Sequence, residues 1–390
     1  MRMLILGGGV AGLVASDMVR RNSPDSRISI FTAEEFPPYY RPRLMDMLAG
    51  KVEMDEIYIK KKEWFVNNGI EVNTKKTVSA INIKQKKVSF ADGTEEEYSR
   101  LLLAMGSFPF KPPIQGIDNK SVFVLRTAQD VIDIRSFAAT RKKAAVIGGG
   151  LLGLESANSL RTLGIEVTVI EGSPYVLPRQ VDEEGSIFIR KKIEETGMLF
   201  RLGVSTVSIN PAGGGLVINF NDGSSLETDF AVVSAGVRSN MDIAKSAGIA
   251  VSRGVLVDDN LKTNIDGIYA AGDICEHRGV LYGIWPAAME QARVAGENIA
   301  GRNTVYSGTV VSTKLKVIGI DCVSLGNIGD KEAKQFKVVD AGKGIYRKVF
   351  VKNGMITGAI FLGDSANSPV IQKMIKDKTN VSGREQEILT

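Results

Sequence analysis

Residues 3–12, MLILGGGVAG, decide the fold, because a short apolar run ends at closely spaced glycines and an apolar pattern of helical spacing follows. This order of strand, tight turn and helix is the phosphate-binding end of a βαβ unit. Gly7 permits the turn, Gly9 lets the backbone approach a pyrophosphate, and Gly12 lets helix and strand pack closely. The helix N-terminus offers free N–H groups and partial positive charge to phosphates. The stretch therefore predicts a dinucleotide site.

The same arrangement recurs at residues 144–171, AAVIGGGLLGLESANSLRTLGIEVTVIE. An apolar strand meets Gly148, Gly150 and Gly153, a helix follows, and a second strand ends in an acid, Glu171. An acid at this position hydrogen-bonds the ribose hydroxyls of a dinucleotide and repels a 2′-phosphate, which favours NADH over NADPH. Two complete fingerprints predict two bound dinucleotides.

The first unit lacks the acid at the usual position. When the second strands of the two units are laid against each other, Thr32 stands where Glu171 stands in the second unit. In place of the missing acid, we expect Glu34, two residues later, to bind the ribose, and Glu35 is the alternative.

Two arginines follow a pair of prolines in the sequence PPYYRPRL. The prolines break the strand and place Arg41 and Arg43 on a short rigid segment. A cation there can meet a pyrophosphate or the edge of a flavin, and the alternative is a solvated loop arginine.

Length and composition indicate a soluble protein with two or three domains. The chain has 390 residues, of which 44% are hydrophobic and 24% are charged. A chain of this length is too long to fold around a single hydrophobic core of ordinary size. No apolar run reaches the roughly 18 residues that a membrane helix needs. The N-terminal apolar segment carries the glycine fingerprint and no cleavage site. We therefore expect it to be part of the mature folded protein and not a signal peptide, and we expect a cytoplasmic protein without a membrane partner.

Cysteine and histidine are scarce. Cys275 and Cys322 are far apart in no metal-binding spacing, and His277 is the single histidine. These counts argue against a disulfide scaffold, a metal or iron–sulfur site and a Ser-His-Asp triad. We therefore expect bound cofactors to supply the chemistry.

The chain is basic, with 49 Lys and Arg against 44 Asp and Glu and a net charge of +5. The basic clusters lie beside expected helix or strand ends and no aromatic residues alternate with them, so nucleic acid is not expected. An acidic protein partner fits this balance.

The first nucleotide unit is expected to be interrupted by the second. A buried strand at residues 101–104 closes at Gly106, residues 111–113 form a linker, and a strand at 230–234 ends at Gly236. Hairpin signals lie at residues 92–93 and 221–223.

Another strand, at residues 268–271, is followed by Gly272 and Asp273, and an acid there can take ribityl or ribose hydroxyls of a cofactor. The next helix begins at Pro286 and stops at Gly301.

The expected fold class is α/β, with two Rossmann-like, doubly wound domains and a small C-terminal α+β domain. The expected bounds are residues 1–112 and 231–302 for the first domain, 113–230 for the second and 303–390 for the third. The last segment has a hairpin signal at 352–354 and a helix over 369–376.

The motifs GGGVAG, LLLAMGSFP, GGGLLG with Glu155 and Glu171, and IYAAGD, in that order, resemble the two-dinucleotide-binding flavoprotein family of pyridine nucleotide-dependent reductases. The resemblance covers essentially the whole chain and implies FAD on the first unit, NAD(H) on the second and an interface-like C-terminal domain. PPYYRPRL and STKLKVIGID are most similar to rubredoxin reductases and to the N-terminal part of assimilatory nitrite reductase large subunits. We expect no sirohaem or iron–sulfur module, because no further cysteines are present.

The chain departs from the family at two places. The family's LLLATG is LLLAMG here, so Met105 replaces a hydroxyl side chain. The lysine that many related ferredoxin reductases carry shortly after the RP pair is missing, and Asp46 lies near its place. In those relatives the lysine pairs with the acid that corresponds to Glu155, and Arg43 is the substitute here.

No firm catalytic residue is expected, with Arg43 and Glu155 as possible support. The candidate cofactor-binding residues are Gly7, Gly9, Val10, Ala11, Gly12, Glu34, Glu35, Arg41, Val78, Ala104, Gly106, Gly272 and Asp273 for FAD, and Gly148, Gly150, Leu151, Leu152, Gly153, Glu155, Glu171 and Gly236 for the second unit.

The expected reaction is hydride transfer from NADH to FAD, with the positive end of the helix at Pro286 near the flavin. Residues 34–50 contain no cysteine, so electrons are expected to leave the flavin directly. The first hypothesis is an NADH-dependent reductase of a small acidic iron protein such as rubredoxin, in a monomer or a homodimer. The alternatives are an NADH oxidase that uses oxygen and a redox-responsive FAD- and NAD-binding interaction protein.

Overall fold

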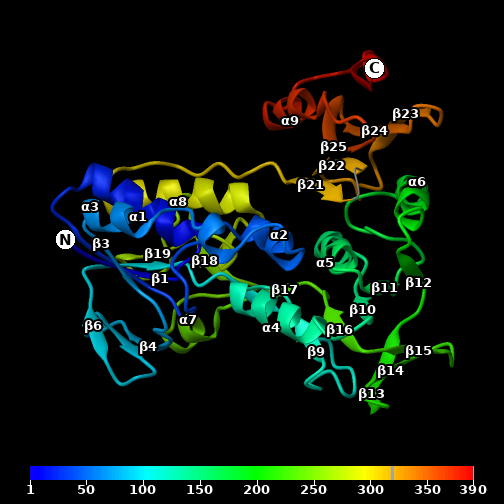
Figure 1. Ribbon diagram of the computed structural model, residues 1–390. Coiled ribbons are helices and arrows are strands. Elements are labelled where there is room, and N and C mark those ends of the chain that lie inside the picture. The colour runs from blue at the N-terminus through cyan, green and yellow to red at the C-terminus, as the bar shows by residue number, and fades with distance from the viewer. Residues whose placement is uncertain (318–319, 390) are drawn as a thin grey trace.

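The computed structural model describes residues 1–317 and 320–389. Two parallel sheets, each with helices packed on it, and a C-terminal antiparallel sheet form the body of the molecule (Figure 1). The predicted class, two Rossmann-like units with a small α+β domain after them, is confirmed.

The first sheet has the order β19-β7-β1-β2-β3, and all of its strands are parallel. Four of these strands precede the second sheet in sequence, whereas β19 (Ile268–Ala270) follows it, so the chain leaves this unit and returns. The other bounds are β1 (Arg2–Leu6), β2 (Arg27–Phe31), β3 (Ile70–Asn73) and β7 (Arg100–Leu103).

Helices α1 (Val10–Asn22) and α8 (Trp285–Ile299) lie side by side on the first sheet (Figure 1). They pack so closely that a Cβ on Gly296 would lie 2.8 Å from the carbonyl oxygen of Ala15. A larger residue at 296 would therefore separate the two helices.

The second sheet has the order β12-β11-β10-β16-β9 and is also parallel. Its strands are β9 (Val122–Val124), β10 (Lys143–Ile147), β11 (Glu166–Glu171), β12 (Leu199–Leu202) and β16 (Phe230–Val233), and its helices are α4 (Ala128–Ala138), α5 (Leu151–Thr162) and α6 (Glu183–Glu194).

Strand β16 pairs with β10 over its whole length. We propose the domain bounds given by the sequence, with the return to the first unit placed after β16. There the two-stranded sheet of β8 (Ser107–Pro109) and β17 (Val237–Ser239) joins the outgoing and returning segments.

Two antiparallel three-stranded sheets extend the parallel units. They are β4 (Val78–Asn82), β5 (Lys87–Phe90) and β6 (Glu95–Glu97), and β13 (Thr206–Ala212), β14 (Gly215–Phe220) and β15 (Ser225–Thr228). The hairpin signals at residues 92–93 and 221–223 lie between β5 and β6 and between β14 and β15, as predicted.

The C-terminal sheet has the order β21-β22-β25-β24-β23 and is antiparallel throughout. Its bounds are β21 (Ser312–Val317), β22 (Ile320–Gly326), β23 (Lys334–Asp340), β24 (Ile345–Lys352) and β25 (Met355–Leu362), with α9 (Ser368–Lys376) against it. The hairpin signal at 352–354 joins β24 to β25, as predicted.

A polar contact attaches the C-terminal sheet to the second unit. Asp182, the N-cap of α6, accepts a hydrogen bond from the Gly185 amide, 3.0 Å away. Its carboxylate also accepts from the Tyr346 hydroxyl, with oxygen–oxygen distances of 2.9 and 2.8 Å, and forms an ion pair with Lys348. Nearby, the exposed Glu184 pairs with Lys337 at 2.8 Å. Strand β21 of the same sheet lies beside α5.

The shorter elements are η1 (Arg41–Arg43), α2 (Leu44–Leu48), η2 (Met54–Ile57), α3 (Lys62–Asn67), α7 (Asp242–Ser246), β18 (Val255–Val257), β20 (Cys275–His277) and η3 (Glu387–Leu389). Within residues 1–317 and 320–389, no helix has the length and apolar character needed to cross a membrane.

Candidate functional site

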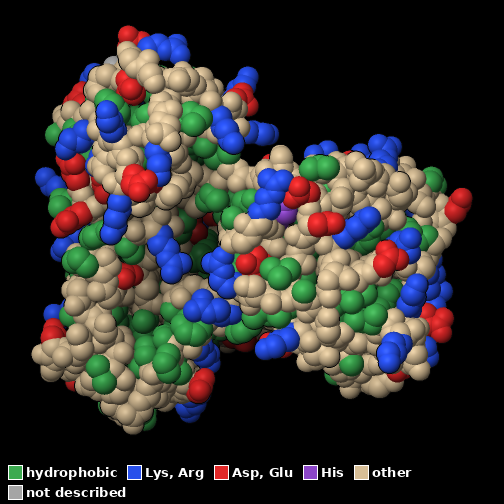
Figure 2. Space-filling model, turned by 180° about the vertical axis from the view of Figure 1, so that it is seen from behind, with side chains coloured by type: hydrophobic (Ala, Val, Ile, Leu, Met, Phe, Trp, Pro, Cys, Tyr) green, Lys and Arg blue, Asp and Glu red, His purple; other side chains and the backbone are tan. Residues whose placement is uncertain are grey.

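A cavity of about 940 Å³ is lined by residues of both parallel-sheet units and by β21 of the C-terminal sheet. Figure 2 shows the molecule hollowed between its lobes, with Lys and Arg side chains around the hollow. The predicted site residues that line the cavity are Gly7, Gly9, Val10, Ala11, Glu34, Arg41, Val78, Ala104, Gly106, Leu151, Leu152, Glu155, Gly272 and Asp273.

The first glycine turn joins β1 to α1 at the wall of this cavity. Gly7 has φ +124°, and a Cβ there would overlap the carbonyl oxygen of Ala104. A Cβ on Gly12 would overlap the carbonyl oxygen of Gly7, whereas a Cβ on Gly9 would meet no atom within 4 Å. The fold thus requires Gly7 and Gly12, and the space beside Gly9 and the N-terminus of α1 is open to a phosphate group.

The second glycine turn repeats this geometry between β10 and α5. Gly148 has φ +121°, and a Cβ there would overlap the carbonyl oxygen of Ser234. A Cβ on Gly153 would overlap the Gly148 carbonyl oxygen, and the space beside Gly150 is open. These three glycines lie outside the wall of the large cavity, but Leu151, Leu152 and Glu155 of the helix they start are part of it.

Glu171 lies at the C-terminal end of β11 and faces the second glycine turn. Its carboxylate accepts hydrogen bonds from the amides of Gly149 at 2.7 Å and Ser173 at 2.8 Å. In the first unit Thr32 has the corresponding place, since a Cβ on Gly8 would lie 2.8 Å from the Cβ of Thr32. An acid at the end of β11 and none at the end of β2 is the arrangement that the sequence predicts.

Glu34 is held by two side chains of the segment that follows β2. Tyr39 donates its hydroxyl to the Glu34 carboxylate at 2.5 Å, and Arg41 forms an ion pair with the same carboxylate. Arg41 also donates to the Arg126 carbonyl at 2.7 Å. Burial raises the pKa of Tyr39, so its hydroxyl stays protonated. Glu35, the alternative ligand, pairs instead with Lys75 at 2.6 Å on the exposed surface.

Asp273 lies just beyond β19, and its carboxylate receives two donors from other parts of the chain. Arg126 binds it at 2.6 Å and the Ser107 hydroxyl donates to it at 3.1 Å. Arg126 precedes α4, which Thr127 caps, and it lines the cavity. Arg126 was missed by the sequence reasoning, because it is 147 residues from Asp273 and belongs to no motif. The capping box of Thr127 signals the helix start but not this contact.

Helix α8 begins at the cavity. Trp285 and Pro286 of its first turn line the wall, and Tyr40 packs edge-on against the Trp285 ring at 4.8 Å between centroids. The first-turn N–H groups of this helix place partial positive charge at the wall, where a bound anion or a developing negative charge is stabilised.

Glu155, on the second turn of α5, lines the cavity, and the negative charge of another acid acts on it. Burial, together with the negative charge of Asp46 on α2, raises the pKa of Glu155 to about 7. The Arg43 guanidinium, the predicted substitute partner of Glu155, lies with Asp46 at 3.6 Å and donates to the Glu56 carbonyl at 3.1 Å. Arg43 therefore pairs with Asp46 and not with Glu155. The carboxyl group of Glu155 is left with the negative charge of Asp46 acting on it.

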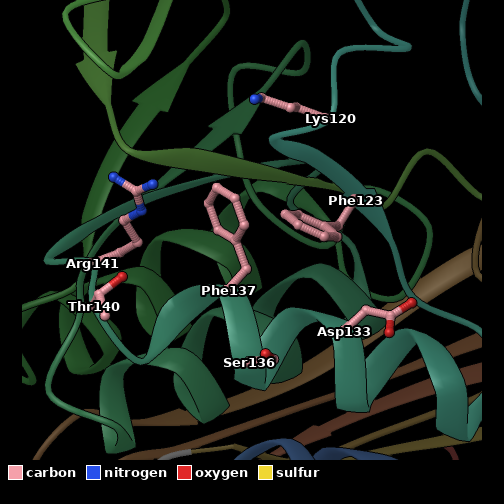
Figure 3. A pocket seen from close by; sticks show the side chains of 7 residues that line it. All are labelled: Lys120, Phe123, Asp133, Ser136, Phe137, Thr140 and Arg141. Carbon is pink, nitrogen blue, oxygen red and sulfur yellow. The ribbon is translucent and has the colours of Figure 1, made fainter.

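Gly236 links β16 to β17, outside the cavity wall, and its carbonyl accepts from the Phe110 amide at 2.9 Å. A second, smaller hollow of about 440 Å³ lies at the far end of α4, where Lys120 and Arg141 flank the Phe137 ring in the view of Figure 3. The Arg141 guanidinium lies 4.8 Å from the centroid of that ring. The predicted site residues do not line this hollow.

Both cysteines are buried and reduced, and neither lines the large cavity. Burial and the nearby Glu276 raise the pKa of Cys275, and burial with Asp321 raises the pKa of Cys322 to about 12. Since the thiolate is the reactive form, these side chains provide no nucleophile at neutral pH.

Residues 1–295 match the family described as pyridine nucleotide-disulphide oxidoreductase, which is three quarters of the chain. The chain belongs to this family. Residues 312–379 match the rubredoxin NAD+ reductase C-terminal domain. The predicted cofactors, FAD and NAD(H), are those that this family binds, and the predicted class, an NADH-dependent flavoprotein reductase, is confirmed at the level of the family.

Among its relatives, a nitrite reductase [NAD(P)H] of Bacillus subtilis is 36% identical over 98% of this chain and 48% of its own. An NADH-rubredoxin oxidoreductase of Clostridium acetobutylicum is 32% identical over 96% of this chain and 94% of its own. The crystal structure of the Clostridium acetobutylicum enzyme has a TM-score of 0.85 and covers 99% of this chain and 97% of its own. The chain spans about half the length of the nitrite reductase relatives it matches.

Proposed function

We propose that this pyridine nucleotide-disulphide oxidoreductase is an NADH-dependent flavoprotein reductase that passes electrons from NADH through FAD to a small acidic iron protein of the rubredoxin type. One observation carries the proposal: the first glycine turn, at Gly9, and the second unit's helix, at Glu155, line the same cavity. Two nucleotides bound to the two turns would therefore meet in a single space.

The residues around the first turn fit a flavin dinucleotide. The open space beside Gly9 and the N-terminus of α1 suit its diphosphate. Glu34 is positioned to accept ribose hydroxyls, because a carboxylate has about four lone-pair sites and keeps acceptor capacity beside Tyr39 and Arg41. Asp273, oriented by Arg126 and Ser107, is positioned to accept further hydroxyls.

The residues around the second turn fit NADH. Gly150 and the N-terminus of α5 suit its diphosphate, and Glu171 is fixed by two backbone amides at the place of a ribose ligand. A carboxylate at this place disfavours the 2′-phosphate of NADPH.

When bound, FAD supplies hydride acceptance from a nicotinamide and onward electron transfer. The chain's own part is to bind the two nucleotides and to orient them in one cavity. The first turn of α8 stabilises negative charge at the wall, so the transfer requires no general base. Because Cys275 and Cys322 are buried away from the cavity, the electrons leave without a cysteine intermediate.

Two observations support a small acidic iron protein as the electron acceptor: the family match of the C-terminal domain and the net positive charge of the chain. The domain over residues 312–379 matches that of rubredoxin NAD+ reductases, and the net charge of +5 favours association with an acidic carrier. Association steered by charge weakens with ionic strength, so turnover should be slower in salt.

The test is to mix FAD-loaded protein anaerobically with NADH, to follow flavin bleaching, and then to add oxidised rubredoxin to one sample and oxygenated buffer to another. Fast reduction of the iron chromophore, slowed by salt, supports the proposal. Bleaching with rapid oxygen consumption but no rubredoxin turnover replaces it with the oxidase. Bleaching without either acceptor favours the redox-responsive binding protein, and no bleaching refutes delivery of NADH by the second unit.

A further inference from the structure

Glu155 and Asp46 come from two helices that pack against each other at the cavity. Helix α2 rests on α5, where the Ser159 hydroxyl donates to the Met45 carbonyl at 2.8 Å. Glu155 lines the cavity one turn beyond the start of α5, about 6 Å along the axis at 1.5 Å per residue. A nucleotide that extends from the second glycine turn into the shared cavity would therefore run beside Glu155.

The cations of the neighbouring elements η1 and β21 form ion pairs with other acids. Arg43 of η1 lies with Asp46 at 3.6 Å, and Lys314 of β21, which lines the cavity, lies with Asp321 at 3.4 Å. On β11, Glu171 is turned to the Gly149 amide. Among the residues that the structure describes, no ion pair or hydrogen bond reaches the Glu155 carboxylate.

Apart from Glu171, the charged residues of the strands behind α5 lie at the far end of the sheet. Lys143 of β10 and Glu166 of β11 form an ion pair there at 3.9 Å. The charged group that acts on Glu155 is therefore Asp46, which adds to the effect of burial and raises the pKa of Glu155 to about 7. The proton on Glu155 is therefore lost or gained readily near neutral pH when a charge is brought beside it.

The two redox forms of the nucleotide differ in the charge of the nicotinamide ring. The nicotinamide ring of NAD⁺ is cationic, and the ring of NADH is neutral. A cation beside a buried carboxyl group favours its ionised form, and a neutral ring does not.

We propose that Glu155, with the negative charge of Asp46 nearby, makes the relative affinity for NAD⁺ and NADH depend on pH: binding of NAD⁺ ionises Glu155 and sends its proton to solvent, and binding of NADH leaves the proton in place. This inference rests on the proposed function, in which the second unit binds the nicotinamide nucleotide. Below pH 7 the site favours the neutral ring, and above pH 7 the ionised carboxylate favours NAD⁺.

Linkage gives the size of the effect. If NAD⁺ lowers the pKa of Glu155 by one unit, about 0.4 proton leaves per nucleotide bound at pH 7. The affinity for NAD⁺ relative to the neutral ring then rises about fivefold between pH 6 and pH 8.

The experiment is isothermal titration calorimetry of the FAD-loaded protein at pH 7, in two buffers of different ionisation enthalpy. The two probes are NAD⁺ and tetrahydro-NADH, which has a neutral ring and donates no hydride to the flavin. We expect proton release with NAD⁺ and almost none with tetrahydro-NADH.

Three variants locate the proton. Glu155→Gln should bind both probes without differential release, and Glu166→Gln, an exposed acid at the far end of β11, should behave as the wild type. Asp46→Asn removes the negative neighbour, so the pH of maximal release should move down.

Equal release with both probes, or release that persists in Glu155→Gln, overturns the inference and leaves the proposed function standing. Binding of neither probe to the wild type overturns the proposed function, and the inference with it. If Glu155→Gln fails to fold, an unmoved maximum in Asp46→Asn overturns the inference.

Discussion

The contact of Asp182 with β24 allows a sharp prediction about how the C-terminal sheet is held. Asp182→Asn keeps the shape of the side chain and an oxygen for the Gly185 amide and the Tyr346 hydroxyl, but it removes the negative charge beside Lys348. The Lys348 residue is only 7% exposed, so its ammonium group would be left buried without a counter-charge.

The cost follows from the burial of the pair. Removal of one partner of a buried ion pair costs about 3–5 kcal/mol, because the other charge stays desolvated. Since the Asp182 side chain is 27% exposed, water can partly solvate the site. We therefore expect a cost at or just below the lower end of that range, about 2–3 kcal/mol in the free energy of unfolding.

Equilibrium urea unfolding of the wild type, Asp182→Asn, Lys348→Met and the double variant measures this cost as a double-mutant cycle. We expect a coupling energy of about 2 kcal/mol, because Lys348→Met removes the unpaired charge when it is combined with Asp182→Asn. Glu184→Gln is the matched control: its exposed pair with Lys337 should be worth at most about 1 kcal/mol. A coupling energy near zero, or a loss for Asp182→Asn no greater than for Glu184→Gln, would refute the argument.

Three further predictions concern the cavity. Gly7→Ala should prevent folding, because the new Cβ would overlap the Ala104 carbonyl, whereas Gly9→Ala should fold and lose FAD affinity, as circular dichroism and flavin titration would show. Glu171→Gln should weaken NADH binding about tenfold or more through loss of a charged hydrogen-bond acceptor, and unchanged affinity by fluorescence titration would contradict the assignment. Nucleotide-free protein should lose up to about 3 kcal/mol of stability as pH rises from about 5 to about 8, because the folded state holds the Glu155 proton more tightly than the unfolded chain. Urea unfolding across this pH range should show the loss in the wild type and not in Glu155→Gln.

Features fixed by local chemistry were predictable from the sequence. The two glycine turns, the acid that ends β11 and the hairpins at 92–93, 221–223 and 352–354 each depend on a few adjacent residues, because glycine and a period of two or 3.6 determine them. The interruption of the first unit followed from the order of these motifs, and β19 shows it directly.

Contacts between distant segments could not be predicted. The partner of Asp273 is Arg126, and that of Asp182 is Lys348, 166 residues away; no local pattern marks either pair. The partner proposed for Glu155 by analogy, Arg43, faces Asp46 here, since both residues lie on one short segment. Such pairings depend on how whole units pack, and one sequence carries no signal for that.

The near-identical sterics of the two glycine turns make each an internal reference for the other. An alanine at Gly9 and one at Gly150 both enter open space, and alanines at Gly7 and Gly148 both overlap a carbonyl oxygen. Any general effect of the substitution on a βαβ unit should thus be shared by the matched variants. The difference between their phenotypes then reports which nucleotide each turn serves, within a single polypeptide and without comparison to another protein.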